Sequence, residues 1–328
     1  MKLSDFYYEL PKKLIAQHPI SPRHNSRMLV AGKKIEHKHF YDIIDMLRKD
    51  DILVLNETKV IPAKLVGRKE TGAKIELIVE HASGKQCGCH IKGTKPRVGN
   101  KLIFRKFYAE IIKHENDVFT VVFNADVDSV MKRIGKLPTP PYVKEKLRRN
   151  SEYQTVYSRK NGSIAAPTAG FHFTKKLLEK LQRKGIKIAK VCLHVGFGTF
   201  LPVRDLQIHS MHAEYFEVDQ KNANIINNRN GRLFAVGTTC VRVLESAADE
   251  HGMIHPMHGK TNLFITPGYK FKTRIDGLIT NFHLPQSTLL MLVSAYFGRK
   301  KILKLYTLAM RKKYRFYSFG DASLLLIE

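Results

Sequence analysis

The 328-residue sequence lacks tryptophan, is poor in cysteine and has few acidic residues for its size. Its four cysteines, at positions 87, 89, 192 and 240, are too few and too scattered for a disulfide framework. This usage favours a reducing compartment and predicts a cytoplasmic protein. No stretch of about 18 apolar residues occurs, so no membrane-spanning helix is expected. The first residues, MKLSDFYYELPKKL, contain no apolar run of signal-peptide length.

Cys87, Cys89 and His90 form a short cluster of metal-ligating residue types. A zinc site built from such a cluster needs a second pair of ligands at a suitable spacing, and no such pair follows in the sequence. We therefore expect no bound metal.

Basic residues outnumber acidic residues by 56 to 29, which gives a formal net charge of +27. The hydrophobic content of 43% is that of a folded globular protein. A surface this positive attracts polyanions, and nucleic acid is the leading candidate partner. The alternative is that the chain comes from an organism whose proteins are generally rich in lysine.

The pattern of residues changes twice along the chain. Residues 42–55 are typical of a short helix followed by a buried strand. Residues 62–125 instead contain short alternating strands between glycine turns, which indicate a small antiparallel barrel. A helix is expected over 126–135, and the proline-stiffened segment 137–142 leads out of it.

We therefore expect an inserted β-barrel domain over residues 62–150. The remaining residues, 1–61 and 151–328, are expected to form a discontinuous α/β domain with a mixed sheet covered by helices. In this domain, helices are expected at 174–184, after Thr239 and at 287–297, and strands at 186–195, 211–218, 233–236 and 276–280.

A loop of small residues, SIAAPTAGFHFT, leads into the helix that Thr174 is expected to cap. Pro167, Thr168 and Gly170 are too small to build a core and too apolar for a solvated linker. They run directly into His172. Such a loop is suited to form the wall of a substrate cleft.

The segment TNFHLPQSTLL repeats this plan at the end of strand 276–280, where Asn281 and His283 precede a helix capped by Ser287. Ligands bind at the carboxyl ends of strands in α/β sheets, so we expect these loops to share one cleft. A last polar loop, YSFGD, brings Asp321 near the C-terminus, where a simple turn is an equally good explanation.

The segment HVGFGTF follows strand 186–195. If its side chains keep alternating, His194, Gly196 and Gly198 face the same way, and Thr199 comes next. Two glycines on one face leave room for a ligand against the backbone. A bulge or a tight chain crossing explains them equally well.

His212 and Glu214 are expected to share one face of strand 211–218. A carboxylate beside an imidazole can orient the ring or shift its pKa. A pair with a purely structural role is the more common case.

The segment AVGTTCVRVLES is typical of a strand, a tight turn at Gly237 and a helix. The free amides of such a helix start favour an anion, and Thr238 and Thr239 add hydroxyl groups. Arg242 could contribute to the same site, although an ordinary surface ion pair with Glu245 explains it as well.

Taken together, these segments resemble the S-adenosylmethionine:tRNA ribosyltransferase-isomerase family of queuosine biosynthesis. The likeness covers nearly the whole chain, through DFYYELPKKLIAQHP, ILVLNETKVIPAKLVGRKETGAKIEL, AAPTAGFHFT, LHVGFGTFLPV, MHAEYFEV, VGTTCVRVLES, TNFHLPQSTLLMLVSAYFG and YRFYSFGDASLL. Any one segment would be weak evidence, and it is their order along the chain that makes the resemblance specific. Departures such as Cys240, where the family usually has serine, remove no ionisable group.

The resemblance implies an α/β domain with an inserted barrel, and a reaction that the residues alone do not disclose. The ribosyl part of S-adenosylmethionine is transferred to 7-aminomethyl-7-deazaguanine at the wobble position of a tRNA and isomerised. The product is epoxyqueuosine-tRNA, and adenine and methionine are released. S-adenosylmethionine is consumed as a substrate, and no metal or other cofactor is implied. The expected partners are S-adenosylmethionine and this tRNA, with no membrane, and we expect a monomer.

This chemistry needs a base, because the positive sulfonium acidifies the adjacent ribose C–H. We favour His172 and His194, since small residues beside each leave space for a substrate. The full set of candidate catalytic residues is His172, His194, His212, His283 and Glu214. Candidate substrate-binding residues are Pro167, Thr168, Gly170, Gly196, Gly198, Thr199, Gly237, Thr238, Thr239, Arg242 and Asn281. Candidate tRNA-binding residues are Lys144, Lys146, Arg148, Arg149, Arg311, Lys312 and Lys313.

Two functions of other classes also fit part of the sequence. A basic RNA-binding protein without catalysis would use the loops structurally and would release no adenine from S-adenosylmethionine. A metal-dependent RNA phosphoesterase could use the histidines as ligands, and EDTA would then inhibit it.

Overall fold

The computed structural model describes residues 1–93, 95–115, 117–200 and 211–327, and the chain divides into two compact units. Unit 1 comprises Met1–Lys59, Pro141–Asn161 and Ala166–Glu328, and unit 2 comprises Val60–Pro140 and Gly162–Ala165. Residues 141–150, which we expected in the inserted domain, therefore lie in unit 1. Hydrogen bonds of Gln17 explain this, because its amide donates to the Tyr142 carbonyl at 3.0 Å and accepts from the Lys144 amide at 2.8 Å.

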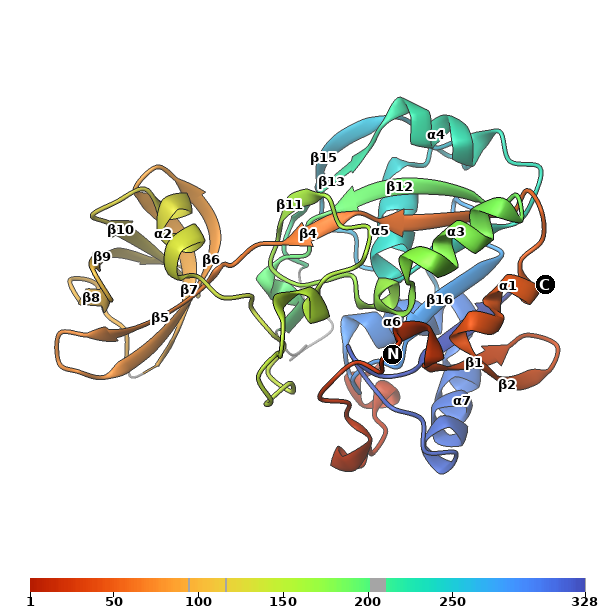
Figure 1. Cartoon of the computed structure of the whole chain (residues 1–328), viewed down its shortest axis with the longest axis horizontal. Coiled ribbons are helices and arrows are strands. Elements are labelled where there is room, and N and C mark those ends of the chain that lie inside the picture. Colours follow the sequence, from red (N-terminus) through yellow and green to blue (C-terminus); the bar gives the residue numbers. More distant parts are fainter. Residues whose placement is uncertain (94, 116, 201–210, 328) are drawn as a thin grey trace. The chain divides into compact units, whose positions relative to one another are not determined.

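The core of unit 1 is a nine-stranded sheet in which parallel and antiparallel neighbours are mixed, as predicted (Figure 1). The strands lie in the order β15 (Met257–Thr261), β13 (Glu214–Val218), β12 (Lys187–Leu193), β3 (Ile52–Asn56), β14 (Leu233–Val236), β16 (Gly277–Asn281), β17 (Ala322–Leu326), β1 (Arg27–Ala31) and β2 (Ile35–His39). The central strands β12, β3, β14 and β16 are parallel, whereas β17 runs against β16 and β13 runs against β12.

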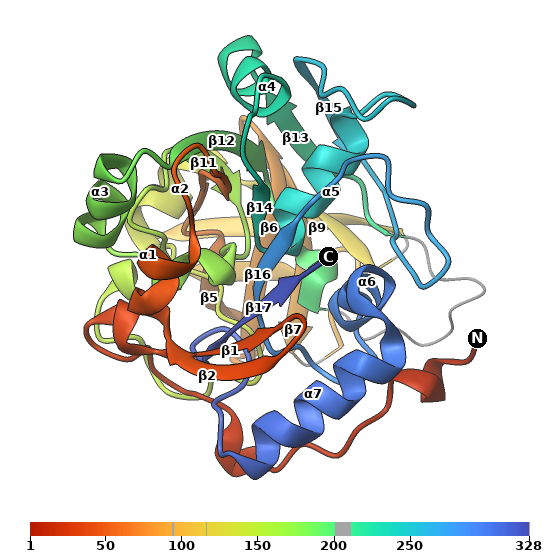
Figure 2. The ribbon, with the colours of Figure 1, turned by 90° about the vertical axis from the view of Figure 1, so that its right-hand side faces the viewer.

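Helices cover both faces of this sheet. Figure 2 shows α1 (Ile43–Met46) and α3 (Lys175–Arg183) on one side and α5 (Thr238–Ala247) and α6 (Thr288–Phe297) on the other. Covering both faces explains why every residue of β3 is buried. Two further α-helices in the described part of unit 1 are α4 (Gln220–Asn227) and α7 (Arg299–Arg311).

The predicted strand–loop–helix modules are confirmed. The Thr174 hydroxyl accepts from the Leu177 amide at 3.2 Å and starts α3, and the Ser287 hydroxyl does the same for the Leu290 amide of α6. The apolar side of α3 packs against the sheet, with Leu181 fully buried.

Two expectations about strand ends were wrong. β12 ends at Leu193 and is followed by a 3₁₀ turn, Phe197–Phe200, so side chains do not keep alternating through HVGFGTF. β13 begins at Glu214, so His212 precedes the strand instead of sharing its face.

Unit 2 contains a closed six-stranded antiparallel barrel, which confirms the predicted fold class. The chain forms β5 (Lys64–Lys69), β6 (Lys74–Ser83), β7 (Gln86–Gly93), β8 (Lys101–Phe104), β9 (Phe107–Glu115) and β10 (Val118–Phe123), joined around the barrel in the order β10-β7-β6-β5-β8-β9. The helix α2 (Val127–Ile134) packs on the barrel core, and Asp126 caps it. A separate two-stranded sheet pairs β4 (Thr58–Val60) with β11 (Lys160–Ser163).

The cluster of Cys87, Cys89 and His90 lies on β7. Both thiols are buried in the barrel core, whereas His90 pairs with Glu80 at 3.2 Å. Because side chains alternate along a strand, His90 points to the face opposite the thiols. Within the described residues of the whole chain, no helix is long and apolar enough to cross a bilayer.

Candidate active site

The parallel strands of unit 1 end at one edge of the sheet, and most predicted site residues follow them there. Asn56 ends β3, His194 follows β12, Gly237 follows β14 and Asn281 ends β16. The Asn56 side chain ties two of these ends together, since its amide donates to the Leu193 carbonyl at 3.0 Å. This is the edge at which α/β sheets bind ligands.

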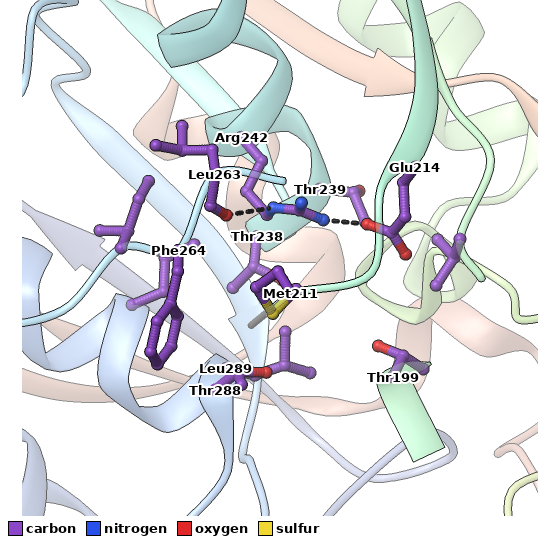
Figure 3. Close-up of a pocket in the computed structure, with 13 residues that line it drawn as sticks. Thr199, Met211, Glu214, Thr238, Thr239, Arg242, Leu263, Phe264, Thr288 and Leu289 are labelled. Atoms are coloured by element: carbon purple, nitrogen blue, oxygen red, sulfur yellow. Dashed lines mark hydrogen bonds and ion pairs between the residues drawn. The ribbon is translucent and has the colours of Figure 1, made fainter. Parts of the chain in front are cut away.

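A pocket that is partly open to solvent lies at this edge (Figure 3). We call it the first pocket. Its polar lining comes from Thr199, Glu214, Thr238, Thr239, Arg242 and Thr288, and its apolar lining from Val195, Met211, Leu263, Phe264, Ile265, Leu289 and Leu292. A mainly apolar wall with a few convergent polar groups is typical of a small-molecule site.

A buried ion pair forms one wall of the first pocket. Arg242 of α5 donates from Nη1 to Glu214 Oε2 and from Nε to the Leu263 carbonyl at 3.0 Å (Figure 3). Its Nη2 donates to the Thr261 carbonyl at 3.4 Å. Both residues are only 6% exposed. All three guanidinium nitrogens are thus occupied, so Arg242 shapes the pocket and its charge is neutralised by Glu214.

Glu214 also holds the glycine segment, because its Oε1 accepts from the Gly196 amide at 2.8 Å. The surface pair of Arg242 with Glu245 that we considered from the sequence does not form. Glu245 is buried and accepts from the Lys272 and Thr273 amides at 2.9 and 3.0 Å.

The start of α5 contributes donors to the first pocket. Gly237 has a φ of 89°, a conformation that favours glycine, and it lets the chain turn sharply from β14 into α5. Thr238 and Thr239 then line the pocket in the first turn, where helix amides are unpaired. Thr239 Oγ1 is buried and has no hydrogen-bond partner in the described part of the chain. The geometry fits the predicted anion site.

His212 lies beside the first pocket. It is exposed, and its neighbour Met211 lines the pocket together with Glu214. A Cβ added at Gly198 would lie 2.8 Å from Cδ2 of His212, so the ring covers this glycine. No hydrogen bond ties the His212 ring to another residue whose position the structure describes.

His172 is far more constrained. Asn281 accepts from the Thr168 hydroxyl at 3.1 Å, and its amide nitrogen donates to the Tyr317 carbonyl at 3.1 Å and to His172 Nε2 at 3.2 Å. Because Nε2 accepts, the ring proton is assigned to Nδ1, which lies 2.7 Å from the Ser26 hydroxyl. Burial, helped by the nearby guanidinium groups of two arginines, lowers the pKa of His172 to about 3.

His283 is constrained in a similar way. Its Nε2 lies 2.9 Å from the Thr280 hydroxyl, and its backbone bonds the hydroxyls of Tyr306 and Tyr8. Burial lowers the pKa of His283 to about 3. Protonating either buried ring near neutrality would be strongly unfavourable, so both are suited to hold loops in place.

His194 is less constrained than His172 and His283 but more constrained than His212. Its Nδ1 is 2.7 Å from the Thr58 hydroxyl, and its ring stacks on Tyr215 at 5.4 Å between centroids. Burial lowers the pKa of His194, and the nearby Glu217 carboxylate opposes this shift. The catalytic roles that we favoured for His172 and His194 stay predictions.

His172 also lines a smaller second pocket. Pro19, Ile20, Arg23, Ser26, Phe171, His172, Ser318, Phe319 and Gly320 surround it. Of the predicted loop residues, Pro167 is buried and Thr168 is half-buried. Gly170 is needed for packing, because a Cβ there would lie 2.0 Å from the Tyr157 hydroxyl.

The structure therefore separates the predicted residues into two groups. Around the first pocket it brings together Gly196, Gly198, Thr199, His212, Glu214, Gly237, Thr238, Thr239 and Arg242. Thr168, His172 and Asn281 form the second group, and His194 and His283 join neither by a hydrogen bond between described side chains. The candidate tRNA-binding residues Lys144, Lys146, Arg148, Arg149, Arg311, Lys312 and Lys313 are all exposed.

Sequence reasoning missed the apolar walls. Leu263, Phe264 and Ile265 lie in a loop after β15, and Leu289 and Leu292 lie on α6. Three consecutive apolar residues in a loop are unusual, since loops lie at the surface, and this was a usable signal. Among the described residues, no three His, Cys, Asp or Glu side chains gather in a way that could hold a metal ion.

A mixed α/β sheet with a mainly apolar pocket and a few polar groups at its strand ends is the arrangement in which α/β enzymes bind their ligands. The family described as "Queuosine biosynthesis protein" matches residues 3–325. The chain is 48% identical over 338 residues to the S-adenosylmethionine:tRNA ribosyltransferase-isomerase of Acetivibrio thermocellus, covering 98% of this chain and 99% of that protein. The protein of the same name from Thermoanaerobacter sp. (strain X514) is 46% identical over 342 residues, with coverages of 99% and 100%.

The crystal structure of S-adenosylmethionine tRNA ribosyltransferase from Thermotoga maritima matches with a TM-score of 0.58 and 36% identity, covering 98% of this chain and 100% of that one. The chain therefore belongs to the queuosine biosynthesis protein family. It is a transferase-isomerase of that family.

Proposed function

We propose that the chain transfers the ribosyl part of S-adenosylmethionine onto 7-aminomethyl-7-deazaguanine at the wobble position of a tRNA and isomerises it. The product is epoxyqueuosine-tRNA, with release of adenine and methionine. S-adenosylmethionine is consumed, and the proposal includes no metal or other cofactor. The family and the names of its relatives support the reaction type, and the lining of the first pocket supports S-adenosylmethionine as the ligand.

The first pocket offers matching groups for each part of S-adenosylmethionine. The apolar walls at Phe264 and Leu289 suit the purine and the carbon atoms next to the sulfonium. The start of α5 at Thr238 and Thr239, where helix amides have no partner within the helix, and the unpartnered Thr239 hydroxyl suit the carboxylate. The joint placement of these groups around one cavity is the observation that carries the proposal.

We assign the role of base to His212. It adjoins the pocket, is open to solvent and is not committed to another described side chain, whereas His172 and His283 are buried, uncharged and bonded. In this assignment His212 removes the ribose proton that the sulfonium acidifies. This proposal replaces the catalytic roles that we expected for His172 and His194 from the sequence. In it, His172, His194 and His283 position the loops, and Glu214 holds Gly196 and Arg242 in place.

The test uses purified protein, S-adenosylmethionine and tRNA carrying 7-aminomethyl-7-deazaguanine. Adenine is measured by chromatography, and the modified nucleoside is identified by mass. We expect adenine only with the modified tRNA, and absence of adenine with both substrates present would reject the function. His212→Gln should slow adenine release at least about tenfold, which corresponds to about 1.4 kcal/mol. The matched control is His258→Gln, at an exposed position on β15. A normal rate for His212→Gln would reject the base assignment alone.

A further inference from the structure

The solvent side of α7 carries a line of positive charge. Lys300, Lys304 and Arg311 are exposed and lie at positions i, i+4 and i+11, which share one side of a helix. The opposite side is apolar and buried, with Ile302 and Leu305 against the body of unit 1. We call Lys300, Lys304 and Arg311 the α7 stripe. At 1.5 Å per residue it is about 16 Å long.

The charges of the α7 stripe are not neutralised. The helix, RKKILKLYTLAMR, contains no acidic residue, and none of the stripe residues forms an ion pair with a described side chain. Arg299, which is not part of the stripe, pairs with Asp5 at 2.7 Å. Like charges four residues apart repel, and cations in the first turn oppose the helix dipole. The stripe therefore destabilises the free helix, and a bound polyanion would relieve this.

The end of α7 is tied to the edge that carries the site. Arg27 donates to the carbonyl of Lys312, just after α7, at 2.9 Å, and its Nε lies 3.4 Å from Asp321. Arg27 and Asp321 directly adjoin Ser26 and Gly320, which line the second pocket. The stripe thus leads along the surface of unit 1 toward the functional edge of the sheet. Figure 2 shows α7 on the outside of this unit.

We propose that the α7 stripe holds the phosphate backbone of the RNA substrate. This rests on the proposed function and adds Lys300 and Lys304 to Arg311 as one continuous surface. An RNA backbone fits the α7 stripe because its negative phosphate groups repeat along a line, as the positive side chains of the stripe do. An RNA stem carries a phosphate at every nucleotide of each strand and so presents several phosphates over the length of the stripe.

The test measures binding of an in vitro transcribed tRNA to the full chain over a range of salt concentrations. The stripe variant carries Lys300→Glu, Lys304→Glu and Arg311→Glu. We expect its Kd to rise at least about tenfold near physiological salt. The plot of log K against log salt concentration should become shallower by about 2 to 3, since each phosphate contact releases nearly one counterion.

A matched control carries Lys33→Glu, Lys34→Glu and Lys49→Glu, which lowers the net charge equally. These exposed residues lie in the turns after β1 and before β3, at the opposite edge of the sheet. We expect less than about a threefold change in Kd for this variant. Equal weakening in both variants, or none in the stripe variant, would overturn the proposal.

Folding of each variant is checked by its circular dichroism spectrum. If the stripe variant does not fold, the glutamine version of the same three positions replaces it, with the same expected direction. Adenine release by the unchanged chain tests the proposed function separately. If the unchanged chain releases no adenine, the proposed function is wrong. The comparison of tRNA binding between the stripe variant and its control still confirms or rejects the proposed role of the α7 stripe.

Discussion

Acid should unfold unit 1 through His172 and His283. Both rings are buried, with 4% and 8% of their surface exposed, and burial lowers both pKa values from 6.5 to about 3. The unfolded chain therefore takes up these protons near pH 6.5, but the folded chain only near pH 3. The stability that the two neutral rings contribute is fully present above pH 6.5 and is lost as the pH falls toward 3. At about pH 5 the loss is about 2 kcal/mol for each ring, or about 4 kcal/mol together.

The assay is urea unfolding of the chain at about pH 7.5 and about pH 5. His172→Gln removes one titrating ring, so the drop in unfolding free energy between the two pH values should shrink by about 2 kcal/mol. The variant also loses contacts, which lowers its stability at both pH values and leaves the difference interpretable. His258→Gln, at an exposed position, should keep the full drop. If His172→Gln also shows the full drop in unfolding free energy between the two pH values, burial does not hold the His172 ring neutral and the reasoning fails.

Three further outcomes are expected. Thr239→Val should weaken S-adenosylmethionine binding more than tRNA binding in isothermal titration, because the hydroxyl lines the first pocket; an equal loss of both would argue against the anion site. Glu214→Gln leaves the Arg242 charge buried and unpaired, so thermal unfolding should show a loss of about 3 kcal/mol or more; an unchanged melting temperature would show that the pair is not buried in solution. Gly198→Ala places a Cβ 2.8 Å from the His212 ring, so kcat for adenine release should fall with little change in melting temperature, and full activity would speak against His212 as base.

Local signals in the sequence predicted the modules around the site well. Caps such as Thr174 and Ser287 and the turn at Gly237 act within a few residues of the elements that they start, so their effect can be recognised in a short segment. The parallel edge followed from the alternation of strands and helices. These features predicted that most candidate residues follow the carboxyl ends of the parallel strands, where the structure has them.

Contacts between distant segments could not be predicted in this way. From the sequence, Arg242 could pair with either of two acidic residues, Glu245 on its own helix or Glu214 earlier in the chain. It pairs with Glu214 because α5 packs against β13 in the folded protein. The His172 ring is held by a hydrogen bond with the hydroxyl of Ser26, which lies 146 residues away in the chain. The low pKa of its ring is a consequence of burial, and burial belongs to the assembled core.

The insertion of unit 2 also has a consequence for the order of folding. The chain leaves unit 1 shortly after β3, yet β3 pairs with β12, in which Lys187 lies opposite Ile52. If the intervening chain is still unfolded, pairing β3 with β12 closes a loop of roughly 130 residues. In the folded barrel, Lys64 lies beside Lys136. A barrel that folds first therefore shortens this loop by roughly 70 residues and lowers the entropic cost of closing it by about 0.7 kcal/mol. Because its pairings are local, the barrel is expected to form early and the central sheet late.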